Sequence, residues 1–320
     1  MTADASAPVP PADVTVVVVT WQGAHLLTAC LDSLRRQTVG HRVIVVDNAS
    51  TDGTVELLAA RDDVQVVRCT ENTGFAGGVQ AGLDQVRTGF AALLNNDAVA
   101  EPDWLAALLA AAQRRPDAAA ITSLLLLAGT QPPVVNNAGV IVLDSWYGAD
   151  RAAGADPASV AEPAEVFGFS GGAALLRTHA VRAVGGFDPR YFLYYEDTEL
   201  AWRLREAGWT VWFEPTAVVV HQHAASTDPR SRLFAHVTER NRLWMLWRHA
   251  PVPVAVGVTV RFVVTTLSLV VRPAPAVDGA RPWNLRPGVR WSVLRDAVGG
   301  LPRCVRGRPT GRSVDPRRWR

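Results

Sequence analysis

Short polar clusters follow apolar segments at four points in the first hundred residues. They are Thr20-Trp21 and the segments 47–52 (DNASTD), 72–74 (NTG) and 95–97 (NND). Ligands bind at the carboxyl ends of strands in α/β sheets, so we expect the four clusters to converge on one crevice. The first turn, TWQGAH, holds a single Gly and cannot form the G-x-G-x-x-G cradle of dinucleotide-binding sheets.

Asp97 is the carboxylate of the fourth cluster. Without a Gly-rich cradle, a bound diphosphate would need a divalent cation as its main counter-charge. Carboxylate oxygens suit Mg²⁺ or Mn²⁺, which are also bound through waters and substrate phosphates. The alternative is a cap for the helix that begins near Pro102, but such a cap would lie several residues too early. The sequence therefore predicts a Mg²⁺ or Mn²⁺ ligand at Asp97.

Three carboxylates, Glu196, Asp197 and Glu199, crowd the start of a predicted helix. A helix N-terminus favours acids by about 0.3–1 kcal/mol each, so capping is the alternative explanation. Capping does not explain the four aromatic residues at 191, 192, 194 and 195, or the segment FGFSGG at 167–172. Acids beside aromatic walls have the raised pKa and the stacking surfaces of a sugar-acceptor site, which is the function we predict for this segment.

A pair of histidines, His221 and His223, ends an apolar run that is typical of a strand. They share one face of that strand and precede the hydroxyl pair Ser226 and Thr227. Lone histidines are usually structural, but two at a strand end beside hydroxyls favour contact with a metal or a pyrophosphate. We expect His221 to make this contact.

The elements that position these residues alternate along the chain. Continuous apolar runs and helical spacings predict strands at 14–20, 42–46, 64–67, 90–94, 119–122, 172–176 and 209–213, and helices at 25–37, 54–61, 76–87, 104–113 and 197–207. This alternation with buried strands predicts a parallel α/β sheet. Much of the segment from about 98 to 165 has no clear periodicity and is left unassigned.

Composition excludes several classes of site. Lysine is absent, which excludes lysine Schiff-base chemistry and the G-x-x-x-x-G-K-[ST] phosphate loop. Three unclustered cysteines predict neither a disulfide framework nor a zinc site. Residues 1–13 are rich in Ala and Pro and lack the features of a signal peptide, so we expect a disordered N-terminus on a cytoplasmic protein.

The C-terminal part combines an apolar segment with a basic one. Residues 251–271 are nearly long enough to span a bilayer, but Arg261 in the middle would cost about 2.5–3.5 kcal/mol to insert. Spanning, lying in the membrane interface and burial in protein all remain open, and we favour the interface. Residues 272–320 hold twelve Arg and three acids. This charge predicts an anionic membrane surface as partner, and no nucleic acid, because no nucleic-acid-binding motif is present.

An ordered set of motifs carries a family resemblance. The motifs are VVVVTWQG, VIVVDNASTDGT, ENTGFAGG, LLNNDA, FGFSGGAALLR, VGGFDPRYFLYYEDTELAWRLREAGW, VVVHQHAAST and ERNRLWML. In this order the chain resembles the family-2 inverting glycosyltransferases of GT-A fold, most closely their bacterial rhamnosyltransferase-like branch. The resemblance implies a Rossmann-like, mostly parallel sheet with flanking helices over 14–250. We expect 251–320 to be an apolar helix and an Arg-rich tail at the membrane.

The resemblance also implies roles for single residues. The nucleotide would be held by residues of the first three clusters, namely Thr20, Trp21, Asp47, Asp52, Asn72 and Gly74. The family's D-x-D metal motif corresponds to Asn95, Asn96 and Asp97, so an Asn replaces its first acid and the expected metal affinity is weaker. The catalytic base maps to Asp197. Glu196 would be its neighbour, Glu199 would orient it or touch the acceptor, and His221 would contact the metal or the diphosphate.

The implied reaction is one in-line displacement that inverts the anomeric carbon. The expected donor is dTDP-rhamnose, and the expected acceptor is a glycan or polyprenyl-linked glycan of cell-envelope polysaccharide synthesis, at the inner face of the membrane. A UDP-galactofuranose or other UDP-hexose donor is an alternative. A sugar-1-phosphate nucleotidyltransferase would need a Gly-rich basic loop after the first strand, which TWQGAH does not provide. A non-catalytic nucleotide-sugar binder is a further alternative, since Asn95 replaces an acid.

Overall fold

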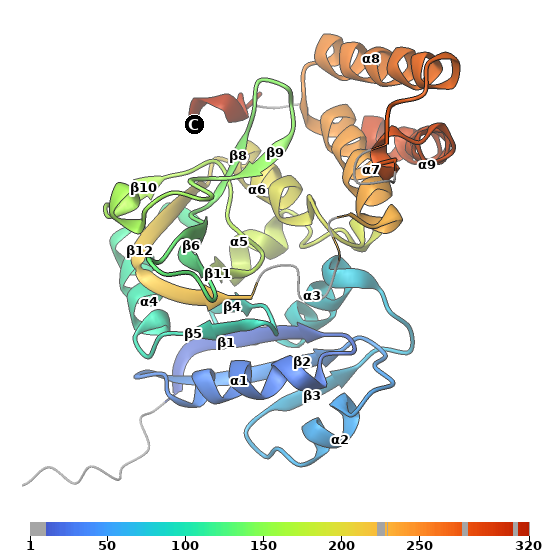
Figure 1. Cartoon of the computed structure of the whole chain (residues 1–320). Helices are drawn as coiled ribbons and strands as arrows, with labels where there is room; N and C mark the ends of the chain where they lie inside the picture. Colours follow the sequence, from blue (N-terminus) through green and yellow to red (C-terminus); the bar gives the residue numbers. More distant parts are fainter. Residues whose placement is uncertain (1–10, 223–227, 229, 277–280, 310–312, 320) are drawn as a thin grey trace, which may run out of the picture.

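A computed structural model describes residues 11–222, 228, 230–276, 281–309 and 313–319 of the chain (Figure 1). Its first half alternates strands and helices, as predicted. The elements are β1 (Pro11–Thr20), α1 (Ala24–Arg35), β2 (Gly40–Asp47), α2 (Thr54–Ala59), β3 (Gln65–Arg68), α3 (Gly74–Gln85) and β4 (Phe90–Leu94). β1 begins at Pro11, earlier than the expected start at residue 14.

The first strands form one parallel part of the sheet, and β6 and β12 form another. β1 pairs in parallel with β2 on one side and with β4 on the other, and β2 pairs in parallel with β3. Val16 and Val18 pack in one core with residues of α1, whereas Val17 packs on the other face with residues of α3. Both faces of β1 are therefore buried, which is why its sequence is continuously apolar.

The second half adds strands of both directions. Its elements are β5 (Ala98–Ala100), α4 (Trp104–Arg114), β6 (Ala118–Leu127), β7 (Val135–Asn137), β8 (Val140–Val142), β9 (Gly148–Asp150), β10 (Ala164–Glu165), β11 (Ala173–Arg177), α5 (Thr178–Ala183), α6 (Glu196–Glu206) and β12 (Thr210–His221). The strands of the main sheet run in the order β10-β12-β6-β11-β4-β1-β2-β3, with β5 paired to β12 and β7 to β6. β11 is antiparallel to both β4 and β6, so the sheet is mixed rather than wholly parallel.

Three helices follow the sheet: α7 (Arg232–His249), α8 (Val252–Val271) and α9 (Pro287–Arg306). α7 packs against both others through a small core of Leu243, Phe262, Val293 and Leu294. α8 lies at the edge of the molecule, away from the sheet (Figure 1). Among the described residues it is the helix whose length and composition would suit a membrane span, and only 22% of its apolar window is buried against protein.

Candidate active site

A cavity of about 790 Å³ lies at the carboxyl ends of β1, β2 and β4. Volumes of this size hold small-molecule ligands in other proteins. Its wall also includes the loops at 170–172 and 192–195 and the beginnings of α6 and α7. The predicted site residues that line it are Trp21, Asn72, Gly74, Asn95, Asn96, Asp97, Glu196, Asp197 and His221. The predicted convergence of the strand-end clusters is therefore present.

Three predicted nucleotide-binding residues, Thr20, Asp47 and Asp52, are not among those that line the cavity. Asp47 Oδ1 accepts a hydrogen bond from the backbone N–H of residue 50 at 3.0 Å, and Asp52 Oδ2 accepts one from the first N–H of α1 at 3.1 Å. Gln22, which the sequence did not single out, accepts from the N–H groups of residues 51 and 52 at 2.8 and 3.0 Å. These contacts fix the two loops beside Trp21, which is 45% exposed and offers its indole as a surface for stacking.

An amide network shapes the third cluster. Asn48 Nδ2 donates to Asn72 Oδ1 at 3.0 Å and to the carbonyl of Gly74 at 2.9 Å, and its Oδ1 accepts from the Thr73 N–H at 3.0 Å. Gly74 has φ +71°, and a Cβ there would come within 2.2 Å of the Phe192 carbonyl oxygen. Only glycine fits this position, because both the backbone conformation and the close approach exclude a side chain.

The sheet brings Asp97 and His221 together, although they are far apart in sequence. His221 is the last residue of β12 and pairs with Ala98 at the start of β5. Its Nε2 lies 3.1 Å from Asp97 Oδ1, and its Nδ1 lies 2.7 Å from Asn136 Oδ1. An amide oxygen only accepts, so in neutral His221 the proton resides on Nδ1. The Nε2 lone pair then faces Asp97 and accepts a hydrogen bond from Asn95 Nδ2 at 3.3 Å.

This pair fits a divalent cation. Asp97 Oδ1 is buried and accepts no hydrogen bond within the described part of the chain. An orphaned carboxylate oxygen beside an imidazole lone pair is a donor set for Mn²⁺ or Mg²⁺. No group of three or more His, Cys, Asp or Glu suited to a metal occurs among the residues that the structure describes, so substrate phosphates and waters would complete the shell. The other predicted histidine, His223, lies outside the described residues.

The start of α6 presents two acids to the cavity, the buried Glu196 and the half-buried Asp197. Asp197 Oδ2 accepts from the Gly171 N–H at 3.0 Å, and its Oδ1 accepts from the Thr198 hydroxyl at 3.0 Å. Burial raises the pKa of Asp197 above its ordinary value, with a smaller opposing effect from these hydrogen bonds. Burial and the charge of Asp197 raise the pKa of Glu196 well above its ordinary value, and Glu196 Oε2 has no partner among the described residues. A carboxylate with a raised pKa is suited to proton transfer near neutral pH.

Comparison with known families decides the assignment. Residues 91–275 match the model of glycosyl transferase family group 2, and residues 15–126 match that of glycosyl transferase family 2. The chain belongs to the family-2 glycosyltransferases.

Two curated glycosyltransferases of Mycobacterium tuberculosis are similar to it. The pre-mycofactocin glycosyltransferase is 30% identical over 213 residues, which cover 66% of this chain and 43% of that protein. The N-acetylglucosaminyl-diphospho-decaprenol L-rhamnosyltransferase is 51% identical over 69 residues, which cover 21% of this chain and 22% of that protein. The matched regions therefore span less than half of each relative.

Solved structures show that the glycosyltransferase has the GT-A fold. GalNAc-T7, crystallised with UDP, GalNAc and Mn²⁺, aligns with a TM-score of 0.62 and 14% identity over 91% of this chain and 57% of that one. Staphylococcus aureus TarS 1–349 in complex with UDP-GlcNAc aligns with a TM-score of 0.53 and 14% identity over 95% of both chains.

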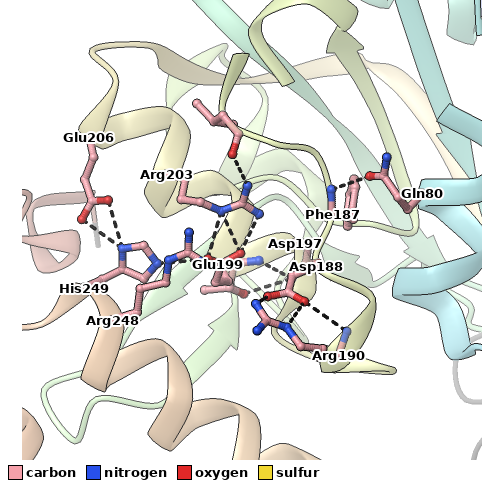
Figure 2. A network of polar contacts seen from close by, with 12 residues as sticks. Gln80, Phe187, Asp188, Arg190, Asp197, Glu199, Arg203, Glu206, Arg248 and His249 are labelled. Carbon is pink, nitrogen blue, oxygen red and sulfur yellow. Dashed lines mark hydrogen bonds and ion pairs between the residues drawn. The ribbon is translucent and has the colours of Figure 1, made fainter. Parts of the chain in front are cut away.

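Glu199, predicted to orient the base or touch the acceptor, does not line the cavity. It is fully buried and accepts a hydrogen bond from Arg203 Nη2 at 2.7 Å. One of its oxygens lies 3.1 Å from Arg248 Nη1 and 3.2 Å from His249 Nε2 (Figure 2). Burial alone would raise its pKa, but attraction to Arg203 and His249 holds the pKa well below the ordinary value. Direct contact with the acceptor is incompatible with this placement. Instead, Glu199 joins α6 to the end of α7.

Several cavity residues had no signal in the sequence. Of the four predicted wall residues, Phe192, Tyr194 and Tyr195 line the cavity, whereas Tyr191 is buried and does not. Tyr147 and Phe234 extend the wall. Tyr194 packs edge-on against Phe234 of α7, with ring centroids 5.0 Å apart, and Tyr195 Oη accepts from the Gly148 N–H at 3.0 Å. The β8–β9 hairpin that supplies Tyr147 consists of three-residue strands, which are too short to show periodicity.

Proposed function

We propose that this glycosyltransferase moves a sugar from a nucleoside diphosphate onto an acceptor hydroxyl in one displacement that inverts the anomeric carbon. One observation carries the proposal. A single cavity at the strand ends holds both the Asp97–His221 pair and the half-buried carboxylate of Asp197. The Asp97–His221 pair suits the leaving diphosphate, and the Asp197 carboxylate suits the incoming hydroxyl. The cavity thus offers separate groups for the donor and for the acceptor.

In this proposal Asp197 is the general base. Its carboxylate takes the proton of the acceptor hydroxyl while the hydroxyl oxygen attacks the anomeric carbon, and the bond from that carbon to the diphosphate oxygen breaks. The N–H of Gly171 and the hydroxyl of Thr198 hold the carboxylate in one orientation. Asp197 Oδ1 also accepts from the Thr198 N–H, so both of its lone pairs are used. The proton therefore goes to Oδ2, which accepts from Gly171 and keeps its second lone pair.

Asp97 and His221 would bind the cation beside the diphosphate. When bound, a divalent cation would neutralise charge that develops on the departing nucleoside diphosphate. Asn136 keeps His221 Nε2 aimed at Asp97 through its contact with Nδ1. The presence of Mn²⁺ in the crystal of GalNAc-T7 supports Mn²⁺ as a candidate alongside Mg²⁺.

We propose dTDP-rhamnose as the donor and a polyprenyl-linked glycan as the acceptor. The support is the 51% identity, over 69 residues, to an enzyme named for rhamnosyl transfer to N-acetylglucosaminyl-diphospho-decaprenol. The test uses the full chain with Mg²⁺ or Mn²⁺, a panel of dTDP-, UDP- and GDP-sugars, and that decaprenol-linked acceptor. Rhamnosylated lipid from dTDP-rhamnose alone supports the assignment. A product from another sugar corrects the donor, and no turnover of any donor refutes the proposed function.

We further propose that α8 rests on the cytoplasmic surface of an anionic membrane, where such an acceptor would be presented. Its outer face carries an exposed apolar stripe of Val252, Val256, Val260, Val264, Leu267 and Val271. Arg261 is exposed in mid-helix, which favours a helix lying in the interface over one that crosses the bilayer. The exposed Arg306 of α9 would add about 1 kcal/mol near anionic lipid, whereas the exposed Arg295 pairs with Asp296 at 2.8 Å.

A further inference from the structure

The loop that leads into α6 has an unusual backbone. It follows a short 3-10 turn at Pro189–Tyr191, and three of its aromatic residues have positive φ angles: 64° at Phe192, 67° at Tyr194 and 69° at Tyr195. Residues other than glycine rarely adopt such angles, and each costs on the order of 1–3 kcal/mol unless the surroundings impose it. The loop ends at Tyr195, the residue before Glu196 and Asp197, so its conformation sets the position of both acids.

One buried side chain of α7 holds this loop. Asn241 is fully buried, and its Nδ2 lies 2.8, 2.9 and 2.7 Å from the carbonyl oxygens of Tyr191, Leu193 and Tyr194. The two N–H groups of a primary amide are thus shared among three acceptors of a five-residue loop. If the loop residues returned to negative φ angles, these carbonyl groups would rotate away from Asn241, so the three hydrogen bonds favour the positive φ angles.

Arg240 completes the contact from the same helix. Its Nε and Nη2 donate to Asn241 Oδ1 at 3.0 and 2.8 Å, which fixes the amide with its nitrogen toward the loop. Arg240 Nη2 also donates to the carbonyl oxygens of Arg190 and Tyr191 at 3.1 and 3.0 Å. On the opposite side of the loop, the Phe192 carbonyl accepts from the Ala76 N–H at 3.1 Å in α3. The loop is therefore held between α7 and α3, the helix that begins at Gly74 of the predicted nucleotide-binding cluster.

We infer that Asn241, oriented by Arg240, is a positioning residue that keeps the loop 191–195 in its strained form and so aims Asp197 at the acceptor hydroxyl. The catalytic part of this inference rests on the proposed function, whereas the effect on the loop does not. Asn241 does not line the cavity, so it acts through the loop and not by contact with substrate.

The test compares Asn241→Asp with the wild-type chain. Aspartate has the shape of asparagine and keeps the Arg240 contact, but it removes both donors and turns an oxygen toward the three carbonyls. Hydrogen exchange of a peptide covering residues 188–200 should become about tenfold faster or more, since local opening is no longer opposed. The turnover number kcat should fall by about tenfold or more while the donor KM changes by less than about threefold, because only the acceptor side is displaced.

Two further variants separate the loss of the loop clamp, formed by Asn241 and Arg240, from general destabilisation of the fold. Asp296→Asn removes the charge from a contact of the same helix, at His236, with 3.0 Å between Asp296 Oδ2 and the ring Nε2. It should leave exchange at 188–200 and kcat unchanged. Arg240→Gln removes the guanidinium contacts to Asn241 and to the loop but keeps the Asn241 amide, so it should raise exchange in the same peptide by a smaller factor. It also provides the measurement if Asn241→Asp does not fold.

Exchange is measured without substrate, so the two proposals can fail separately. Faster exchange with no transferase activity in any variant, wild type included, would retain the loop clamp and refute the proposed function. Unchanged exchange at 188–200 in Asn241→Asp, or in Arg240→Gln if the first variant does not fold, would overturn the inference. A matched fall in kcat and rise in donor KM would overturn it as well, because that pattern marks a general loss of structure.

Discussion

Replacing Asp197 by asparagine removes the proposed base with the smallest change in shape. The amide oxygen of the new side chain can still accept from the Thr198 hydroxyl, and the bond from the Gly171 N–H is then lost, at a cost of about 0.5–1.5 kcal/mol. The same substitution removes a buried charge next to Glu196, which offsets part of this cost. We therefore expect a folded enzyme with Asp97 and His221 undisturbed.

The effect on catalysis should be large. General-base catalysis contributes about 10²–10⁴ in rate, which corresponds to roughly 2.7–5.4 kcal/mol of transition-state stabilisation. The assay is steady-state transfer from the nucleotide sugar to the lipid-linked acceptor, with nucleoside diphosphate binding measured by calorimetry. Turnover should fall by about 10² or more with binding nearly unchanged. Near-normal turnover in Asp197→Asn would refute the assignment of the base.

The dependence of transfer activity on pH should reflect the raised pKa of Asp197. Protonated Asp197 cannot accept a proton, so activity should rise with pH through its pKa, which burial places above the ordinary aspartate value. Asp150 lines the same cavity and its charge contributes to that rise in pKa, so Asp150→Asn should move the acidic limb to lower pH. The reasoning fails if the limb of Asp150→Asn moves to higher pH.

Three further predictions concern other parts of the molecule. A chelator should abolish transfer, and Asp97→Ala should weaken nucleoside diphosphate binding; full activity in excess chelator would exclude the proposed cation site. Glu199→Gln should destabilise the fold by about 3–5 kcal/mol in thermal unfolding near neutral pH. Because the folded-state pKa of Glu199 is lowered, this difference should be complete above the unfolded pKa of about 4.3 and shrink below it. Serine at Val256, Val260 and Val264 should weaken cosedimentation with anionic vesicles, as should high salt, and a wild-type chain that ignores such vesicles would refute membrane docking.

The strand and helix pattern from β1 to α4 could be predicted from the sequence because its signals are local. The run at 90–94 coincides with β4, and the helix predicted at 104–113 is α4 within one residue. The start of α7 and the β8–β9 hairpin could not be predicted, because their place in the cavity wall depends on packing across the fold.

Side-chain direction was harder to predict than position. Glu196, Asp197 and Glu199 are neighbours in sequence, yet the first two line the cavity and the third is turned into the protein. The residues that draw Glu199 inward include Arg248 and His249, about fifty positions away, and no local pattern announces them. Likewise, Asp47 and Asp52 follow a strand as nucleotide ligands would, but their oxygens accept from backbone N–H groups, of residue 50 and of the start of α1.

The stereochemistry of the product tests the central claim most directly. The full chain is incubated with the nucleotide sugar that it turns over and the decaprenol-linked acceptor, and the new glycosidic bond is examined by NMR. One displacement with Asp197 as base predicts an anomeric configuration opposite to that of the donor. A product that retains the donor's configuration would contradict the mechanism proposed for this glycosyltransferase.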